Sequence, residues 1–135
     1  MSEANKQLVI EAMDHLSHRR LEPLFAMIHE DGTWGIPYRK DRFEYAGIRD
    51  KAGTVEQLTG FLAAFDSFVY TIEKITAEGD TVMIEATSVG VGPGTARYEN
   101  RYMKSFVIRD GKLFAVREYL DPFAVYAYIE QLTAG

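Results

Sequence analysis

The stretch YENRYMKSFVIRDGKLFAVREYLD, residues 98–121, carries the clearest structural pattern of this chain. Aromatic and apolar residues recur at even spacing around the Asp110-Gly111 pair, as Tyr98, Tyr102 and Phe106 do before it. A period of two is typical of a strand that buries one face, and Asp-Gly between two such runs indicates a hairpin. The stretch therefore predicts two long antiparallel strands joined by a tight turn.

The length of this turn decides which residues face each other across the hairpin. A three-residue loop, Arg109–Gly111, with a glycine bulge would place Tyr102 opposite Glu118 and Lys104 opposite Val116. A plain two-residue Asp-Gly turn would instead put Glu118 on the face opposite to that of Tyr102. The three-residue loop matches the apolar faces better, and it is the register that we expect.

The residues upstream of this hairpin carry both helical and strand patterns. Apolar residues recur at helical spacing in residues 8–16, 24–28 and 55–65. A period of two returns in residues 68–77 and 81–91, with a turn at 78–80. Between the second and third helical segments we expect a turn at 30–32, a short edge strand at 33–38 and a charged loop at 39–53.

Two aspartates mark helix starts. Asp50 precedes the third helical segment, and Asp121 directly precedes Pro122, which is the N-cap and first-turn pattern of a last helix that runs to about Thr133. Helices come first, then a meander of strands, then a closing helix. This order predicts an α+β domain, residues 1–135, with a strongly bent antiparallel sheet, three N-terminal helices on its concave face and a C-terminal helix.

Composition excludes several classes of function. The 135 residues include no cysteine, which excludes disulfides and thiolate chemistry and points to a reducing compartment, so we expect a cytoplasmic protein. The net charge of −5 argues against nucleic-acid binding. No apolar run approaches membrane-spanning length, and the first residues lack the form of a signal peptide.

Three pieces of the chain together resemble a known superfamily: LEPLFAMIHEDGTW (21–34), GTVEQLTGFLAAF (53–65) and the hairpin at 98–121. They resemble the cone-shaped α+β superfamily of nuclear transport factor two, ketosteroid isomerase, limonene-epoxide hydrolase and the SnoaL-like polyketide cyclases. The resemblance covers roughly residues 5–132 and implies a SnoaL-like domain with a conical hydrophobic pocket. Since members include enzymes and non-enzymatic proteins, the fold alone does not fix the activity.

The catalytic positions of these relatives can be compared with this chain. The base, the tyrosine and the second aspartate of ketosteroid isomerase correspond to Ile36, Met13 and Lys104, which are apolar or of the wrong charge. Of five epoxide hydrolase positions, only the carboxylate of the closing strand is matched, by Glu118. The comparison argues against both activities. SnoaL-like cyclases as a class tend to use one inward carboxylate, and Glu118 fits that role.

Glu118 is therefore the candidate catalytic residue. Alternation places it on the inward face of the last strand, with Phe114 and Val116. A carboxylate among apolar neighbours can exchange protons near neutrality, because burial disfavours its charged form. Tyr102 or Lys104 beside it can stabilise an enolate oxygen, which makes these two the other catalytic candidates.

Further residues are expected to form the walls of an apolar ligand pocket. They are Trp34, Ile36, Tyr38, Ser88, Tyr98, Asn100 and Val116. We expect a small apolar molecule as ligand, no cofactor, and a possible isomerase, cyclase or lyase reaction with Glu118 as the proton carrier. The alternative is a structural ion pair of Glu118 with Lys104 or an arginine, in a non-catalytic ligand-binding or dimeric scaffold domain.

The opposite face of the sheet is expected to form a homodimer interface. Its outward residues mix apolar and charged side chains, as interfaces do: Glu85, Thr87, Arg101, Met103, Arg117 and Tyr119. No metal site is expected, because His15 and His18 lie three residues apart without an evident third ligand.

Overall fold

The computed structural model of this chain describes residues 2–134. In chain order its elements are α1 (Ser2–Ser17), α2 (Leu21–Ala26), β1 (Ile28–Ile36), β2 (Gly47–Asp50), α3 (Lys51–Leu62), β3 (Ser67–Glu78), β4 (Thr81–Val91), β5 (Arg97–Arg109), β6 (Lys112–Leu120) and α4 (Pro122–Thr133). None of these helices has the length and apolar character that a membrane span requires.

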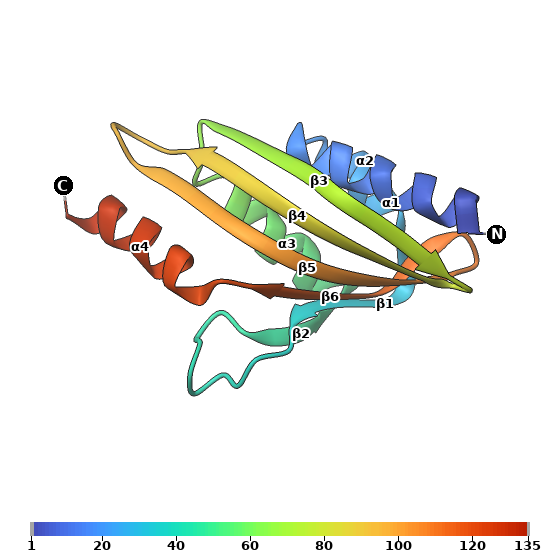
Figure 1. The fold of residues 1–135 in the computed structure, drawn as a ribbon. Helices are drawn as coiled ribbons and strands as arrows, with labels where there is room; N and C mark the ends of the chain where they lie inside the picture. The colour runs from blue at the N-terminus through green and yellow to red at the C-terminus, as the bar shows by residue number, and fades with distance from the viewer. Residues whose placement is uncertain (1, 135) are drawn as a thin grey trace.

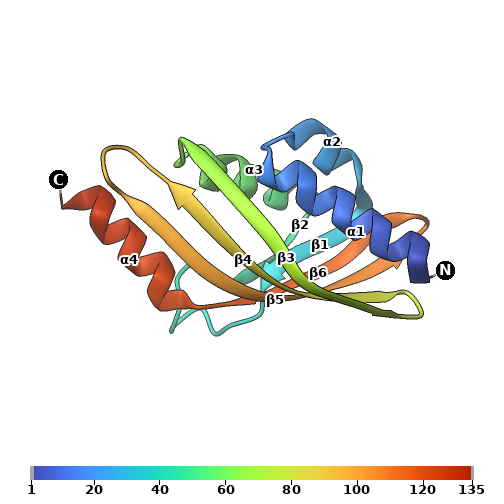
Figure 2. The same cartoon turned by 45° about the horizontal axis from the view of Figure 1, so that its top comes forward.

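One bent sheet organises the molecule. Its six strands within residues 2–134 lie in the order β2-β1-β6-β5-β4-β3, and Figure 1 shows that the long strands β3, β4 and β5 curve together. The helices α1, α2 and α3 lie on the same side of this sheet, while α4 follows β6 at the other end (Figure 2). The mixed α+β fold with a curved, unclosed sheet is the one that the sequence predicted.

One strand pair departs from the antiparallel sheet that we expected. Four of the five pairs within residues 2–134 are antiparallel, but β1 and β6 are parallel. A short turn forces antiparallel pairing only on strands that it connects. β1 and β6 are separated by β2, α3 and three further strands, so no such constraint acts on them.

The β5–β6 hairpin has a different register from the predicted one. Asp110-Gly111 forms a two-residue turn with φ of 54° and 70°, as a type I′ turn requires. An extra residue in β6, Phe114, then shifts the pairing by one. This bulge returns the following residues to the inward face, so that Lys104 lies opposite Glu118 and Tyr102 lies opposite Leu120. The predicted pairing of Tyr102 with Glu118 was therefore wrong, although Glu118 does point inward.

The bulge also changes the role of Phe114, which was predicted to face the core. Leu113 is buried in its place. The ring of Phe114 packs edge-on against His29, with ring centroids 5.2 Å apart, and lies 3.8 Å from the guanidinium of Arg109. Phe114 is thus half-buried against His29 and Arg109 instead of lining the core.

The segment between α2 and α3 is more regular than the sequence indicated. β1 continues through the predicted turn at 30–32, with an irregularity in its pairing to β6 there. The predicted charged loop contains β2, whose four residues pair with the end of β1. A strand of four residues is too short to show the period of two from which strands are predicted.

The starts of the two aspartate-capped helices are as predicted, whereas the second helix spans Leu21–Ala26 and Ile28, predicted as helical, begins β1. The side chain of Asp50 accepts a hydrogen bond of 2.9 Å from Gly53 N, and that of Asp121 accepts one of 2.9 Å from Phe123 N, with Pro122 in the first turn of α4. These caps fix where α3 and α4 begin, and these two helices close the cavity described next.

Candidate functional site

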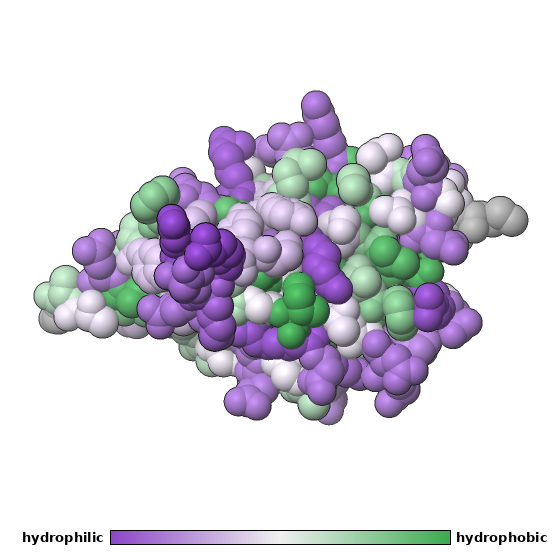
Figure 3. All heavy atoms as spheres, turned by 90° about the horizontal axis from the view of Figure 1, so that it is seen from below, coloured by the Kyte–Doolittle hydropathy of each residue, from purple (hydrophilic) through white to green (hydrophobic). Residues whose placement is uncertain are grey.

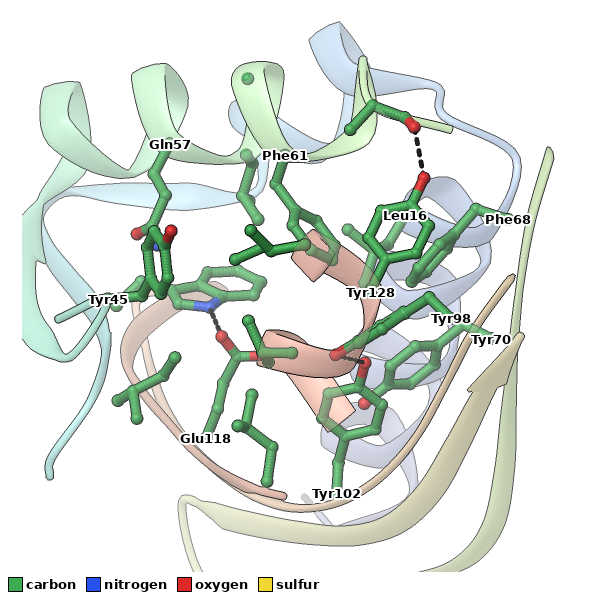
Figure 4. Close-up of a pocket in the computed structure, with 18 of the residues that line it drawn as sticks. Leu16, Tyr45, Gln57, Phe61, Phe68, Tyr70, Tyr98, Tyr102, Glu118 and Tyr128 are labelled. Carbon is green, nitrogen blue, oxygen red and sulfur yellow. Dashed lines mark hydrogen bonds between the residues drawn. The ribbon is translucent and has the colours of Figure 1, made fainter. Parts of the chain in front are cut away.

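A cavity of about 380 Å³ lies between the concave side of the sheet and the helices α3 and α4 (Figure 4). Its walls are mostly aromatic and aliphatic, with Leu58 and Phe61 from α3 and Tyr128 and Ile129 from α4. Cavities of this size and character hold small organic molecules in other proteins. The dimensions of the cavity therefore suit a small apolar ligand.

Glu118 brings a carboxylate into this apolar space. Its Oε1 lies 2.8 Å from Lys104 Nζ, and its Oε2 accepts a hydrogen bond of 3.0 Å from Trp34 Nε1. The three residues come from β6, β5 and β1, which are neighbours in the sheet. Residues of three adjacent strands therefore hold the carboxylate in one position. Figure 4 shows the Glu118 side chain at the wall of the cavity.

The carboxylate, and not the ammonium, is the charged group that a ligand would meet. The side chain of Glu118 is 16% exposed, whereas that of Lys104 is 1% exposed. Lys104 thus lies behind Glu118 and supplies a positive charge to the site without offering a free surface. A ligand in the cavity could contact a carboxylate oxygen directly.

Aromatic rings surround the Lys104 ammonium. Its Nζ lies 4.5, 5.3 and 5.6 Å from the ring centroids of Tyr70, Tyr102 and Trp34. Burial lowers the pKa of Lys104, but the Glu118 carboxylate and the Tyr70 phenol offset this and hold that pKa above its ordinary value. Lys104 is therefore charged at neutral pH. Its ammonium balances the negative charge of the Glu118 carboxylate, because burial keeps water away from the pair.

A chain of hydrogen bonds runs beside this ion pair. Asn100 Nδ2 donates to the Tyr98 hydroxyl at 2.7 Å, and the hydroxyls of Tyr98 and Tyr102 lie 3.1 Å apart (Figure 4). The Tyr102 hydroxyl also lies 2.7 Å from Ser88 Oγ. Burial raises the pKa of both tyrosines, so their phenols stay neutral at physiological pH. The side chains of this chain thus provide hydrogen-bond partners for one another within the wall of the cavity.

The cavity contains six of the residues that the sequence singled out. They are Trp34, Ile36, Tyr98, Tyr102, Lys104 and Glu118. Glu118, Tyr102 and Lys104 thus lie close together, as predicted. The residue that contacts the Glu118 carboxylate directly is Lys104 and not Tyr102.

The other four predicted wall residues lie outside the cavity lining. Ser88 and Asn100 stand behind Tyr98 and Tyr102 as their hydrogen-bond partners, and Val116 is part of the core. Tyr38 bridges the backbone of Leu120, donating to its carbonyl and accepting from its N–H at 2.6 Å each. Alternation finds the face of a strand correctly, but it does not show how deep a residue lies behind that face.

Sequence reasoning missed part of the cavity wall. Tyr70 on β3 could have been found, since it alternates with buried Phe68 in a strand that was predicted. Tyr45 lies in the segment between β1 and β2, which carries no periodic signal, and α4 contributes Tyr128 from a helix whose position no local pattern defines. Among residues 2–134, no three histidine, aspartate or glutamate side chains gather as metal ligands.

The SnoaL-like domain family model matches residues 9–116, so this chain belongs to that family. A curated relative, UPF0523 protein C of Dictyostelium discoideum, is 24% identical over 102 residues, which make up 73% of this chain and 65% of that protein. The chain thus spans slightly less than two thirds of that relative's length.

Solved structures share the fold at low identity. TerC, co-crystallised with polyporic acid, has a TM-score of 0.80 at 20% identity and is matched over 94% of this chain and 98% of its own. IdmH, a candidate polyketide cyclase from Streptomyces antibioticus, has a TM-score of 0.76 at 19% identity over 93% and 97% of the two chains. An epoxide hydrolase from M. tuberculosis has a TM-score of 0.76 at 16% identity over 99% and 98%.

The geometry of the ion pair predicts strong coupling between its two members. Glu118→Gln leaves the Lys104 ammonium buried without its counter-charge and should lower the free energy of unfolding by roughly 3 kcal/mol. Adding Lys104→Met removes that charge and should restore most of the loss. Urea unfolding of the four proteins of this double-mutant cycle measures the coupling.

The exposed pair of Arg97 and Glu99 provides the control, because Glu99→Gln should cost under about 1 kcal/mol. Additive losses for Glu118→Gln and Lys104→Met would show that the two charges do not depend on each other.

Proposed function

We propose that this protein binds a small apolar carbonyl compound in its cavity and moves a proton on it with Glu118, as a cofactor-free isomerase, cyclase or lyase. The observation that carries this proposal is a single carboxylate, held by Lys104 and Trp34, at the wall of an otherwise apolar cavity. The named activities of the fold neighbours, a candidate polyketide cyclase and an epoxide hydrolase, concern small organic molecules, and this supports the same kind of ligand here.

The reaction step follows from the position of the charges. A Glu118 oxygen removes the proton from the carbon next to the ligand's carbonyl group, and the electrons of the C–H bond move to the carbonyl oxygen to form an enolate. The positive charge of Lys104 favours this enolate over the neutral ketone. In an isomerase the carboxylic acid returns the proton to a different carbon of the conjugated enolate. In a cyclase the enolate carbon attacks a second carbonyl of the same molecule, and the oxygen of that carbonyl takes the proton from Glu118.

The second candidate is a ligand-binding domain without turnover. It is favoured by the engagement of both carboxylate oxygens, since Oε1 pairs with Lys104 and Oε2 accepts from Trp34. In that case the ion pair stabilises the walls of the cavity, and the bound molecule leaves unchanged.

Proton exchange at carbon separates the two candidates. We expect the protein to accelerate the incorporation of deuterium from D₂O into 2-tetralone, an enolisable bicyclic ketone, as followed by NMR. Glu118→Gln should reduce the catalysed rate on the order of a hundredfold or more, and so should Glu118→Gln combined with Lys104→Met, in which no buried charge is left unpaired. Glu78→Gln, an exposed carboxylate at the end of β3, is the control.

Each result has a distinct meaning once circular dichroism shows that the variants are folded. Acceleration that both Glu118 variants lose supports proton transfer. Binding of 2-tetralone without acceleration would contradict catalysis and leave the ligand-binding alternative. Acceleration that persists in both variants would remove Glu118 from the mechanism.

We also propose that two copies of the chain associate through the convex face of the sheet. Met103 and Tyr119, which are register partners on β5 and β6, are each about half exposed on this face. Glu85 pairs with Met103 from β4, and Arg101 is an exposed neighbour in β5, so the face carries charges of both signs. A two-fold axis can therefore bring opposite charges together around an apolar centre.

Figure 3 views the molecule from below, where hydrophobic side chains are scattered among hydrophilic ones. The loop between β1 and β2, which is the lowest part of Figure 1, carries exposed Arg39, Lys40 and Arg42.

The dimer predicts a specific response to a charge at its centre. Met103→Glu should convert a dimer into a monomer, because it places an unpaired carboxylate in the interface beside Glu85. Light scattering at micromolar concentration measures the mass, and Ile10→Glu on the exposed side of α1 is the control that should remain a dimer. A wild-type protein that is monomeric at these concentrations would contradict the proposal.

A further inference from the structure

Gln57 places a polar amide on the side of α3 that faces the cavity. It lies three residues after Thr54 and four before Phe61, and all three residues line the cavity. Apolar residues usually occupy the inward stripe of a helix, because this stripe packs against the core. Thr54 keeps its hydroxyl within the helix, where Oγ1 donates to the carbonyl of Asp50 at 2.8 Å. The amide of Gln57 is therefore a polar group that this stripe can offer to the cavity.

The amide stands where the cavity opens to solvent. Among the tyrosines that line the cavity, Tyr45 is 36% exposed, whereas Tyr98 and Tyr102 are 2% and 5% exposed. Tyr45 thus marks the open end, or mouth, of the cavity, and the other two mark its inner end. Gln57 is half-buried, and Figure 4 shows it with Tyr45 on one side of Glu118 and the two buried tyrosines on the other. Gln57 therefore lies at the mouth, where a ligand can reach it.

The amide of Gln57 also has its hydrogen-bonding capacity available. Dashed lines in Figure 4 mark the hydrogen bonds among the residues drawn, and none of them reaches Gln57. They do reach four other labelled side chains of the wall, which are Tyr98, Tyr102, Glu118 and Tyr128. A side-chain amide offers two N–H donors and a carbonyl acceptor. A hydroxyl group both donates and accepts, so it can pair with this amide in either direction.

We infer that the Gln57 amide binds a hydroxyl group at the outer end of the ligand, so that the cavity takes an apolar ring compound with a carbonyl group at one end and a hydroxyl group at the other. This inference rests on the ligand-binding role proposed for the cavity, but not on proton transfer by Glu118. A ligand whose carbonyl end lies near Glu118 extends toward the mouth with its other end. Most of the remaining wall is apolar, so a hydroxyl placed elsewhere on the ligand loses its hydrogen bonds to water without replacement.

Three related ketones test this inference. 6-Hydroxy-2-tetralone carries its hydroxyl group at the end of the ring system away from the carbonyl group, 8-hydroxy-2-tetralone carries it on the carbonyl side, and 2-tetralone has none. Equilibrium dialysis gives the dissociation constant of each ketone for wild type and for Gln57→Met, which removes the amide but keeps the length and helix propensity of the side chain. Glu56→Met makes the same replacement on the exposed side of α3 and is the control.

We expect wild type to bind 6-hydroxy-2-tetralone about three- to tenfold more tightly than either of the other ketones, as one net hydrogen bond provides. Gln57→Met should bring the three affinities to within about twofold of one another, and Glu56→Met should keep the wild-type preference. A preference that persists in Gln57→Met, or a wild type that does not favour 6-hydroxy-2-tetralone, would overturn the inference and leave the ligand-binding role of the cavity intact. Failure of all three ketones to bind wild type would overturn both.

Deuterium exchange provides a readout that a purely structural role of Gln57 would not produce. Gln57→Met should raise the KM for 6-hydroxy-2-tetralone about three- to tenfold relative to that for 2-tetralone, and it should leave the ratio of the two kcat values as in wild type. The amide would hold the outer end of the ligand equally before and during proton transfer, which is why KM alone changes. Equal changes for both ketones would mean that Gln57 shapes the cavity, and the inference would fail. A wild type that accelerates exchange of neither ketone would contradict proton transfer by Glu118, and the dissociation constants would still decide the role of Gln57.

Discussion

The ion pair between Lys104 and Glu118 is the interaction around which this structure is arranged. Removing two charges from water is costly, and their mutual attraction offsets that cost only when the geometry is good and the remaining polar atoms are satisfied. Here the charged atoms lie 2.8 Å apart, and Trp34 supplies a hydrogen bond to the second carboxylate oxygen. The rings of Tyr70 and Tyr102 also lie beside the ammonium, where their electron-rich faces stabilise a cation, and Lys104 Nζ donates to Met13 Sδ at 3.8 Å. The pair thus ties three neighbouring strands to one register.

That register depends on a single additional residue in β6. Without the bulge at Phe114, the two-residue turn at Asp110-Gly111 would place Glu118 on the convex face, away from Lys104. With the bulge, the turn keeps its favoured geometry and Glu118 still reaches the cavity. The position of one charged group is therefore set at the far end of the hairpin, where Phe114 packs between His29 and Arg109.

Strand periodicity and helix caps, which depend on residues close in sequence, were sufficient to predict the fold. The period of two holds along β5, and the caps at Asp50 and Asp121 appear as expected, whereas in β6 the bulge at Phe114 interrupts the alternation and the Asp-Gly turn is one residue shorter than predicted. The inward position of Glu118 followed from the same alternation. Its partner did not, because a bulge leaves no clear mark in sequence and shifts every pairing beyond it. Tyr45 and α4 reach the cavity through long-range packing, which no local pattern encodes.

Lys104 remains a buried cation because the Glu118 carboxylate compensates its charge. NMR observation of the Lys104 side-chain nitrogen during an alkaline titration of the folded protein tests this most directly. An ordinary lysine loses its proton near pH 10.4, and the pKa of Lys104 is held above its ordinary value. Its contribution to stability is therefore present at neutral pH and is lost only as the pH rises through that higher pKa. We expect Lys104 to stay protonated after the exposed lysines have lost their protons. A Lys104 that loses its proton at the same pH or earlier would show that Glu118 does not hold its charge.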